Sequence, residues 1–120
     1  MSATVLIVDD AVFMRNILRA IIKDKGYTVV AEAASGIEAM RTFHEHTPDI
    51  VILDIILPDA NGLDLLVSIL KTRPQVKVVI CSSIDQESIV RKALDAGAKA
   101  FIQKPFTPEK VLAALESLEV

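Results

Sequence analysis

VLIVDD, residues 5–10, places four apolar residues directly before two adjacent carboxylates, Asp9 and Asp10. A short aliphatic run of this kind is typical of a strand that is buried on both faces of a parallel sheet. Like charges at the end of such a strand repel each other, so they need a compensating partner. The carboxylate pair is therefore the first candidate for a functional site.

The same kind of apolar block recurs along the chain, separated by longer stretches with helical spacing. The further predicted strands are 28–33, 50–53, 76–81 and 100–102. The stretches with helical spacing are 13–26, 35–46, 63–74, 85–97 and 107–120. Their predicted N-caps are Ser35 and Thr107, and their predicted ends are at Gly26, before Pro74 and at Gly97. Five strand–helix units in a row predict an α/β fold of (βα)5 type, with an open, doubly wound parallel sheet and right-handed crossovers. The length of 120 residues fits one domain, residues 1–120.

The composition and the cysteine count argue against several classes of protein. The net charge of −3 and the pI near 5.3 argue against a nucleic-acid or membrane surface. The N-terminus lacks a secretory signal and no apolar stretch approaches the ~18–20 residues of a membrane span, so we expect a cytoplasmic protein. Cys81 is the only cysteine, which rules out an intramolecular disulfide, and we interpret it as a small buried hydrophobe.

Polar residues gather where the predicted strands end. The first strand runs into Asp9 and Asp10, the third into Asp54, the fourth into Ser82 and Ser83, and the fifth into Lys104 and Pro105. Ligands of open parallel sheets bind outside the carboxyl ends of the strands. Carboxylates at that edge suit a hard divalent cation such as Mg²⁺, and one of them could act as a nucleophile toward phosphorus.

Each of these features also has a structural interpretation. Adjacent acids can complement a helix macrodipole, Asp54 can cap a helix or form a turn, serines can cap helices, and a Lys-Pro pair can simply bend the chain. Their convergence on four strand ends of one predicted sheet favours a site.

The motifs that carry this pattern resemble the receiver domain of two-component response regulators. They are VLIVDD (5–10), PDIVILDIILPDANGLD (48–64), VVICSS (78–83) and DAGAKAFIQKPF (95–106). Within that family the chain is similar to the stand-alone chemotaxis regulators. The resemblance implies a flavodoxin-like strand order 2-1-3-4-5.

The resemblance also implies roles for individual residues. Asp54 would be phosphorylated by a histidine kinase, Asp10 would ligate Mg²⁺ directly, and Asp9 would act on the metal through water. The backbone carbonyl of Ile56 would be a further ligand, and Lys104 would contact a phosphoryl oxygen. Mn²⁺ is the alternative ion.

A switch is implied as well. The Ser82 hydroxyl would move toward the phosphoryl group and Phe101 would follow it, which would alter the face formed by the fourth helix, fifth strand and fifth helix. A protein target would bind that face. The Lys104-Pro105 bond is expected to be cis.

Two departures from the family pattern bear on the expected lifetime of the phosphoryl group. Ile56 and Ile84 stand where fast-cycling members carry polar residues, so we expect slow self-dephosphorylation. Asp59, in the loop 57–62, is interpreted as a solvated charge, with a reach toward the metal site of a phosphate donor as the alternative.

Several alternatives remain open at this point. The chain could be a phosphorelay intermediate, a receiver cut from a longer regulator with an output domain, or an enzyme acting on small phosphorylated metabolites. The loops are too short to form the substrate pocket that such an enzyme needs. We expect a signalling switch and a monomer, with a dimer as the alternative.

Overall fold

The computed structural model describes residues 3–119, and its elements alternate between strand and helix along the chain. The strands are β1 (Thr4–Val8), β2 (Thr28–Ala33), β3 (Ile50–Leu53), β4 (Lys77–Ser82) and β5 (Ala100–Gln103). The helices are α1 (Val12–Lys23), α2 (Gly36–His46), α3 (Gly62–Thr72), α4 (Glu87–Asp95) and α5 (Pro108–Glu116), followed by a 3-10 turn at Ser117–Glu119.

The five strands form one sheet in the order β2-β1-β3-β4-β5, and every neighbouring pair is parallel. The predicted fold class and strand order are confirmed. Because all strands run the same way, their carboxyl ends lie at one edge of the sheet, and the central position of β1 and β3 brings the ends of these two strands together.

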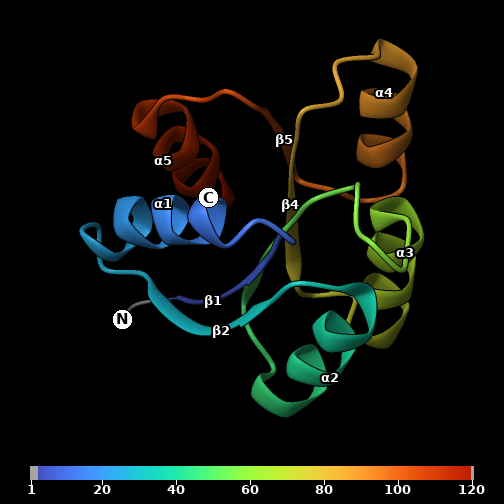
Figure 1. Cartoon of the computed structure of the whole chain (residues 1–120), viewed down its shortest axis with the longest axis horizontal. Coiled ribbons are helices and arrows are strands. Elements are labelled where there is room, and N and C mark those ends of the chain that lie inside the picture. The colour runs from blue at the N-terminus through green and yellow to red at the C-terminus, as the bar shows by residue number, and fades with distance from the viewer. Residues whose placement is uncertain (1–2, 120) are drawn as a thin grey trace.

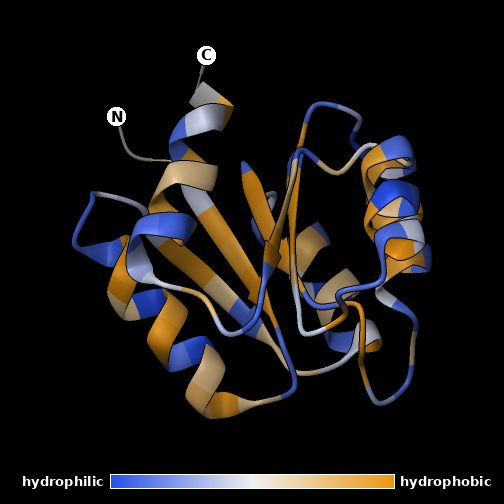
Figure 2. Ribbon diagram, turned by 90° about the horizontal axis from the view of Figure 1, so that it is seen from above, coloured by the Kyte–Doolittle hydropathy of each residue, from blue (hydrophilic) through white to orange (hydrophobic). Residues whose placement is uncertain are grey.

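Helices cover both faces of the sheet, as Figure 1 shows. Helices α1 and α5 pack on one face, where Leu18, Ile22, Val111 and Leu115 are buried against the strands. Helices α2, α3 and α4 cover the other face and bury a second core that includes Phe43. Figure 2 shows the strands between these layers in hydrophobic colours, as expected of a sheet that is shielded from water on both sides.

The helix ends follow local capping signals. Ser35 caps α2 by accepting a hydrogen bond from the Glu38 N–H, and Thr107 caps α5 with Pro108 in its first turn. The predicted helical segments agree with the observed helices to within a few residues at their ends. Helix α1 ends at Lys23, before Gly26, whose φ of +89° suits glycine in the turn that follows.

The helices are too short to serve as membrane spans. The longest helix among residues 3–119, α1, has 12 residues, and no helix in that range is long and apolar enough to cross a bilayer.

Candidate phosphoacceptor site

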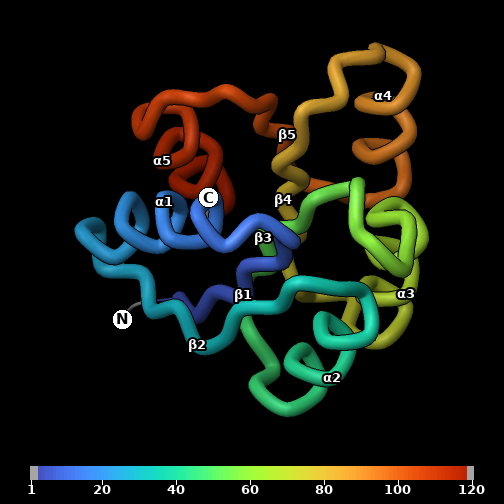
Figure 3. Tube along the Cα trace, viewed as in Figure 1, coloured from blue at the N-terminus to red at the C-terminus, as the bar shows by residue number. Residues whose placement is uncertain are grey.

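Three carboxylates meet at the carboxyl edge of the sheet. Asp9 and Asp10 follow β1, Asp54 follows β3, and one oxygen atom from each can be chosen so that all three atoms lie within 4.8 Å of one another. In Figure 3 the segments that leave β1 and β3 run close together at this point. Asp9 and Asp54 are buried, with 2% and 6% of their surface exposed, whereas Asp10 is exposed.

An ammonium group offsets part of this negative charge. Lys104 Nζ, at the end of β5, lies 2.7 Å from Asp9 Oδ2 and 2.9 Å from Asp54 Oδ2. Burial alone would lower the pKa of the Lys104 ammonium, but its hydrogen bonds and charge attraction to Asp9 and Asp54 outweigh burial and raise that pKa. Lys104 therefore remains protonated at neutral pH. The Lys104-Pro105 bond is cis, as expected.

The donor set fits a hard divalent cation. Carboxylate oxygens are the ligands that Mg²⁺ and Mn²⁺ prefer, and among residues 3–119 one lysine, Lys104, contacts two of the three carboxylates. A bound cation would relieve the repulsion that remains. The acidic cluster of Asp9, Asp10 and Asp54 could therefore hold a metal ion.

The loop after β3 is built closely around Asp54. The Ile56 N–H donates a hydrogen bond to Asp54 Oδ1 (3.2 Å), and the Gly62 N–H donates to the Ile55 carbonyl (2.7 Å). Ile56 also forms an isolated bridge with Asn61, which caps α3, and 56% of its surface is exposed. This loop holds Asp54 at the edge of the sheet and leaves Ile56, two residues further on, open to solvent.

The two residues of the expected switch lie on neighbouring strands. Ser82 is the last residue of β4 and is fully buried, and its Oγ accepts a long hydrogen bond from the Ile84 N–H (3.4 Å). The Ser82 carbonyl accepts a hydrogen bond from the Lys104 N–H (2.9 Å). Phe101 lies on β5, paired with Ile80, and is half-buried. The structure thus places both residues near Lys104, but their roles as a switch stay a prediction.

Comparison with known proteins shows to which family a chain with this site belongs. Residues 5–116 match the model of the response regulator receiver domain. The chain belongs to this family. The receiver matches the chemotaxis protein CheY of Thermotoga maritima with 47% identity over 118 residues, covering 98% of both chains. It matches CheY of Listeria monocytogenes with 49% identity over 111 residues, covering 92% of this chain and 93% of the relative.

A solved relative shows the same fold. The crystal structure of the CheX-CheY-BeF3-Mg²⁺ complex from Borrelia burgdorferi aligns with a TM-score of 0.95 and 37% identity, covering 98% of this receiver and 90% of that chain. The receiver is therefore a two-component signalling protein of the CheY type, and a phosphoacceptor role is supported.

Gly62, the first residue of α3, leaves no room for a larger residue behind Asp54. A Cβ atom at this position would collide with the Asp54 carbonyl oxygen and lie 2.5 Å from Ile55 Cα. Since both obstacles are backbone atoms, Gly62→Ala should lower the free energy of unfolding by at least about 2 kcal/mol, the range of overpacking in a tight core. This loss would occur although alanine favours a helix by about 1 kcal/mol over glycine.

Gly26→Ala is the matched control for Gly62→Ala. A Cβ atom at Gly26 meets nothing within 4 Å, and its only penalty is the strain of a positive φ, about 1–2 kcal/mol. Urea unfolding of both variants and of the wild-type receiver measures the free energies of unfolding to be compared. A Gly62→Ala variant as stable as the wild-type receiver would contradict the close packing of this loop.

Asp59 is exposed to solvent, as predicted for a loop charge, but its carboxylate also binds two backbone N–H groups of α2. Its Oδ1 accepts a hydrogen bond from the Gly36 N–H (2.6 Å) and its Oδ2 accepts one from the Ile37 N–H (3.1 Å). The loop after β3 is therefore tied to the first turn of α2. These backbone hydrogen bonds to a carboxylate lower the pKa of Asp59.

The lowered pKa gives Asp59 a pH-dependent effect on stability. A carboxyl whose pKa is lower in the folded state stabilises that state above its unfolded pKa, near 3.9, and loses this effect as the pH falls through its folded pKa. Asp59→Ala should therefore be less stable than the wild-type receiver at pH 7, and the difference should shrink below about pH 4. Denaturant midpoints measured at several pH values test this. A difference that is constant with pH, or equal to that of Asp85→Ala at another exposed acid, would contradict a stabilising role for the two hydrogen bonds of Asp59.

Cys81 is a buried hydrophobe, as predicted. It lies on β4 with 1% of its surface exposed, and burial raises the pKa of its thiol to about 12. A thiol with this pKa is not a nucleophile at neutral pH.

The sequence did not predict the contacts that Arg15 makes with Glu32 and with the backbone of Asp9. Arg15 and Glu32 carry no motif that distinguishes them from ordinary surface charges, yet Arg15 reaches the backbone of Asp9. Their pairing depends on how α1 docks against β2, which neither spacing nor composition reveals.

Proposed function

We propose that this receiver accepts a phosphoryl group on Asp54 from a histidine kinase and in that state binds a protein target. The observation that carries the proposal is the acidic cluster itself, with the Lys104 ammonium in contact with both Asp9 and Asp54. The CheY relatives are described as chemotaxis proteins, which makes a chemotaxis-type target the favoured one.

In the proposed reaction, an Asp54 carboxylate oxygen attacks the phosphorus of a phosphohistidine. A P–O bond forms, the P–N bond breaks, and the released imidazole nitrogen takes up a proton. Lys104 already lies within 2.9 Å of Asp54 Oδ2, so its ammonium is placed to donate to an oxygen of the transferred group. Ile56 N–H holds the other carboxylate oxygen, which keeps the Asp54 side chain oriented.

Asp10 would ligate Mg²⁺ directly, Asp9 would act on it through water, and Asp54 and the Ile56 carbonyl would complete the protein ligands. The cation, when bound, supplies positive charge that neutralises the transferred phosphoryl oxygens. Mn²⁺ fits the same oxygen donors. The Borrelia burgdorferi relative was solved as a complex with CheX, BeF3 and Mg²⁺, which supports this assignment.

Phosphoryl uptake is the direct test. The receiver incubated with acetyl phosphate and Mg²⁺ should gain the mass of one phosphoryl group, and the same sample in EDTA should gain none. The label should decay slowly, because Ile56 and Ile84 offer no polar group to orient a hydrolytic water. Equal uptake in EDTA, or none in Mg²⁺, would contradict the proposal.

We propose that the output surface is the face formed by α4, β5 and α5. A hollow of about 500 Å³ opens there between β5 and α5, lined in part by Phe101, Lys104 and Lys110. Leu94 of α4 adds an exposed apolar side chain, with 44% of its surface accessible. Lys104 lines this hollow and also contacts Asp54, so a change at Asp54 could reach this face directly.

Ser82→Ala tests whether Ser82 transmits a change at Asp54 to the face formed by α4, β5 and α5. A phosphoryl group brings about two negative charges and strong acceptor oxygens, so the Ser82 hydroxyl would gain a hydrogen bond by moving toward it, and Phe101 could fill the vacated space. The variant should still accept phosphate but show smaller NMR shifts at Phe101 and along α4 and α5 when beryllofluoride and Mg²⁺ are added. Ser83→Ala is the control, since Ser83 is exposed. Wild-type shifts that spare this face would defeat the proposal.

A further inference from the structure

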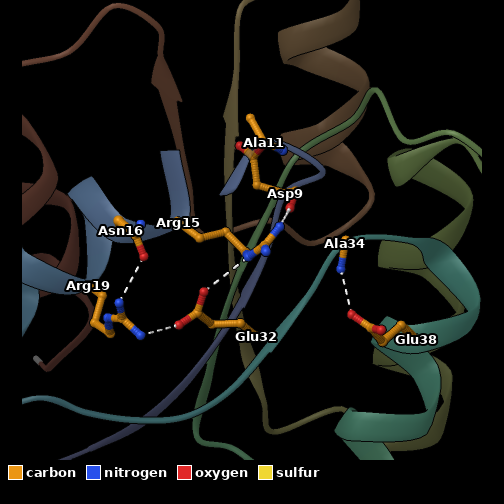
Figure 4. A network of polar contacts seen from close by, with 8 residues as sticks. All are labelled: Asp9, Ala11, Arg15, Asn16, Arg19, Glu32, Ala34 and Glu38. Atoms are coloured by element: carbon orange, nitrogen blue, oxygen red, sulfur yellow. Dashed lines mark hydrogen bonds and ion pairs between the residues drawn. The ribbon is translucent and has the colours of Figure 1, made fainter. Parts of the chain in front are cut away.

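Arg15 connects the acidic cluster to an ion-pair network on the neighbouring helix and strand (Figure 4). It lies in the first turn of α1, and its side chain is only 15% exposed. Side chains of a helix lean toward its N-terminus, which lets Arg15 reach back to the end of β1. There its Nη1 donates a 2.6 Å hydrogen bond to the Asp9 carbonyl oxygen.

The Asp9 carbonyl belongs to the peptide unit that joins Asp9 to Asp10. The rest of Asp9 is already held: its N–H donates to the Ala33 carbonyl (3.0 Å), and its carboxylate accepts from the Ala11 N–H (2.9 Å) and from Lys104 (2.7 Å). Because a peptide unit is planar and rigid, fixing its carbonyl also fixes the direction in which the chain enters Asp10. Arg15 therefore helps to determine where the exposed Asp10 carboxylate lies.

Glu32 on β2 holds the guanidinium in this position. Its Oε1 accepts from Arg15 Nε (3.0 Å) and its Oε2 accepts from Arg19 Nη1 (2.7 Å), while Arg19 is also bonded to Asn16 (2.8 Å). A guanidinium presents donors in a fixed planar fork, so Arg15 can bind Glu32 and the Asp9 carbonyl at the same time. A lysine at this position would keep the charge but would lack the planar pair of donors that binds Glu32 and the Asp9 carbonyl together.

We propose that Arg15 is a positioning residue for the metal site: anchored by Glu32, it orients the Asp9–Asp10 peptide and so sets the affinity of the acidic cluster for Mg²⁺. This inference rests on the proposed Mg²⁺ site. Charge alone would act the other way, because removing a cation near the cluster should favour Mg²⁺ binding. For Arg15→Met, the loss of orientation therefore predicts weaker Mg²⁺ binding, whereas the loss of charge predicts tighter Mg²⁺ binding.

The test is an NMR titration with MgCl₂ that follows the backbone amides around Asp10. Arg15→Met and Arg15→Lys should each weaken Mg²⁺ binding by about tenfold or more, the usual effect of losing a group that orients a metal ligand. Arg19→Met is the matched control: it removes the same charge from the same helix and the same Glu32, but leaves the hydrogen bond to Asp9, so its affinity should stay within about twofold of the wild-type receiver. Glu32→Gln should weaken binding to a smaller extent than Arg15→Met.

Thermal unfolding in EDTA separates positioning from a purely structural role. An Arg15 variant that loses stability in EDTA but binds Mg²⁺ as tightly as the wild-type receiver would overturn the inference, as would tighter binding by Arg15→Met. If Arg15→Met does not fold, Arg15→Lys and Glu32→Gln still decide the question. A wild-type receiver that binds no Mg²⁺ would instead overturn the proposed metal site, and this inference with it.

Discussion

The Asp54→Asn variant should gain no phosphoryl group when it is incubated with acetyl phosphate and Mg²⁺, under conditions that label the wild-type receiver fully. An amide oxygen is a far weaker nucleophile than a carboxylate, so the loss should be complete within the detection limit of intact-mass spectrometry. Asp54 is the member of the acidic cluster that follows β3, and it is buried, with 6% of its surface exposed.

The control for Asp54→Asn is the same chemical change at an exposed carboxylate. Asp64→Asn, in the first turn of α3, should be labelled as well as the wild-type receiver. Circular dichroism should show both variants folded, because asparagine keeps the size of the aspartate side chain. Persistent labelling of Asp54→Asn would mean that another residue accepts the phosphoryl group.

Asp10→Ala should abolish the stabilisation of the receiver by Mg²⁺. A ligand present at about 100 times its dissociation constant adds about 2.7 kcal/mol to the free energy of unfolding, so the wild-type melting temperature should rise measurably with Mg²⁺. Asp10 is exposed, and its removal should spare the fold while it takes away one of the three carboxylates that could hold the cation.

Melting curves in EDTA and in excess MgCl₂ measure this effect. Asp85→Ala provides the comparison, since Asp85 is an exposed acid outside the acidic cluster. It should keep the whole Mg²⁺ shift. An Asp10→Ala variant with an undiminished shift would contradict the assignment of this residue as a ligand.

The strands could be predicted from the sequence because each is an uninterrupted apolar block, and a sheet covered on both faces needs that composition to exclude water. Asp9, Asp10 and Asp54 could be predicted as neighbours because parallel strands end at one edge. Strand order did not follow from periodicity. It came from the resemblance to receiver domains, and the sheet confirmed it.

The supporting contacts could not be predicted, for a physical reason. Asp59 caps α2 across 23 residues of sequence, and Arg15 binds a backbone carbonyl whose position depends on how α1 packs on the sheet. Neither contact leaves a periodic pattern, since a charged residue in an exposed loop or on a helix is the ordinary composition of a surface. Only the folded arrangement distinguishes these two residues from other charged residues of the surface.

Chemical mapping of the phosphoryl group tests the central claim most directly. Borohydride reduces an aspartyl phosphate to homoserine, so reduction of the labelled receiver, followed by proteolysis and tandem mass spectrometry, reports the residue that carried the phosphoryl group. We expect homoserine at position 54, formed only when Mg²⁺ was present during labelling. Homoserine at position 9 or 10, or a borohydride-resistant phosphate on Ser82 or Ser83, would contradict the account.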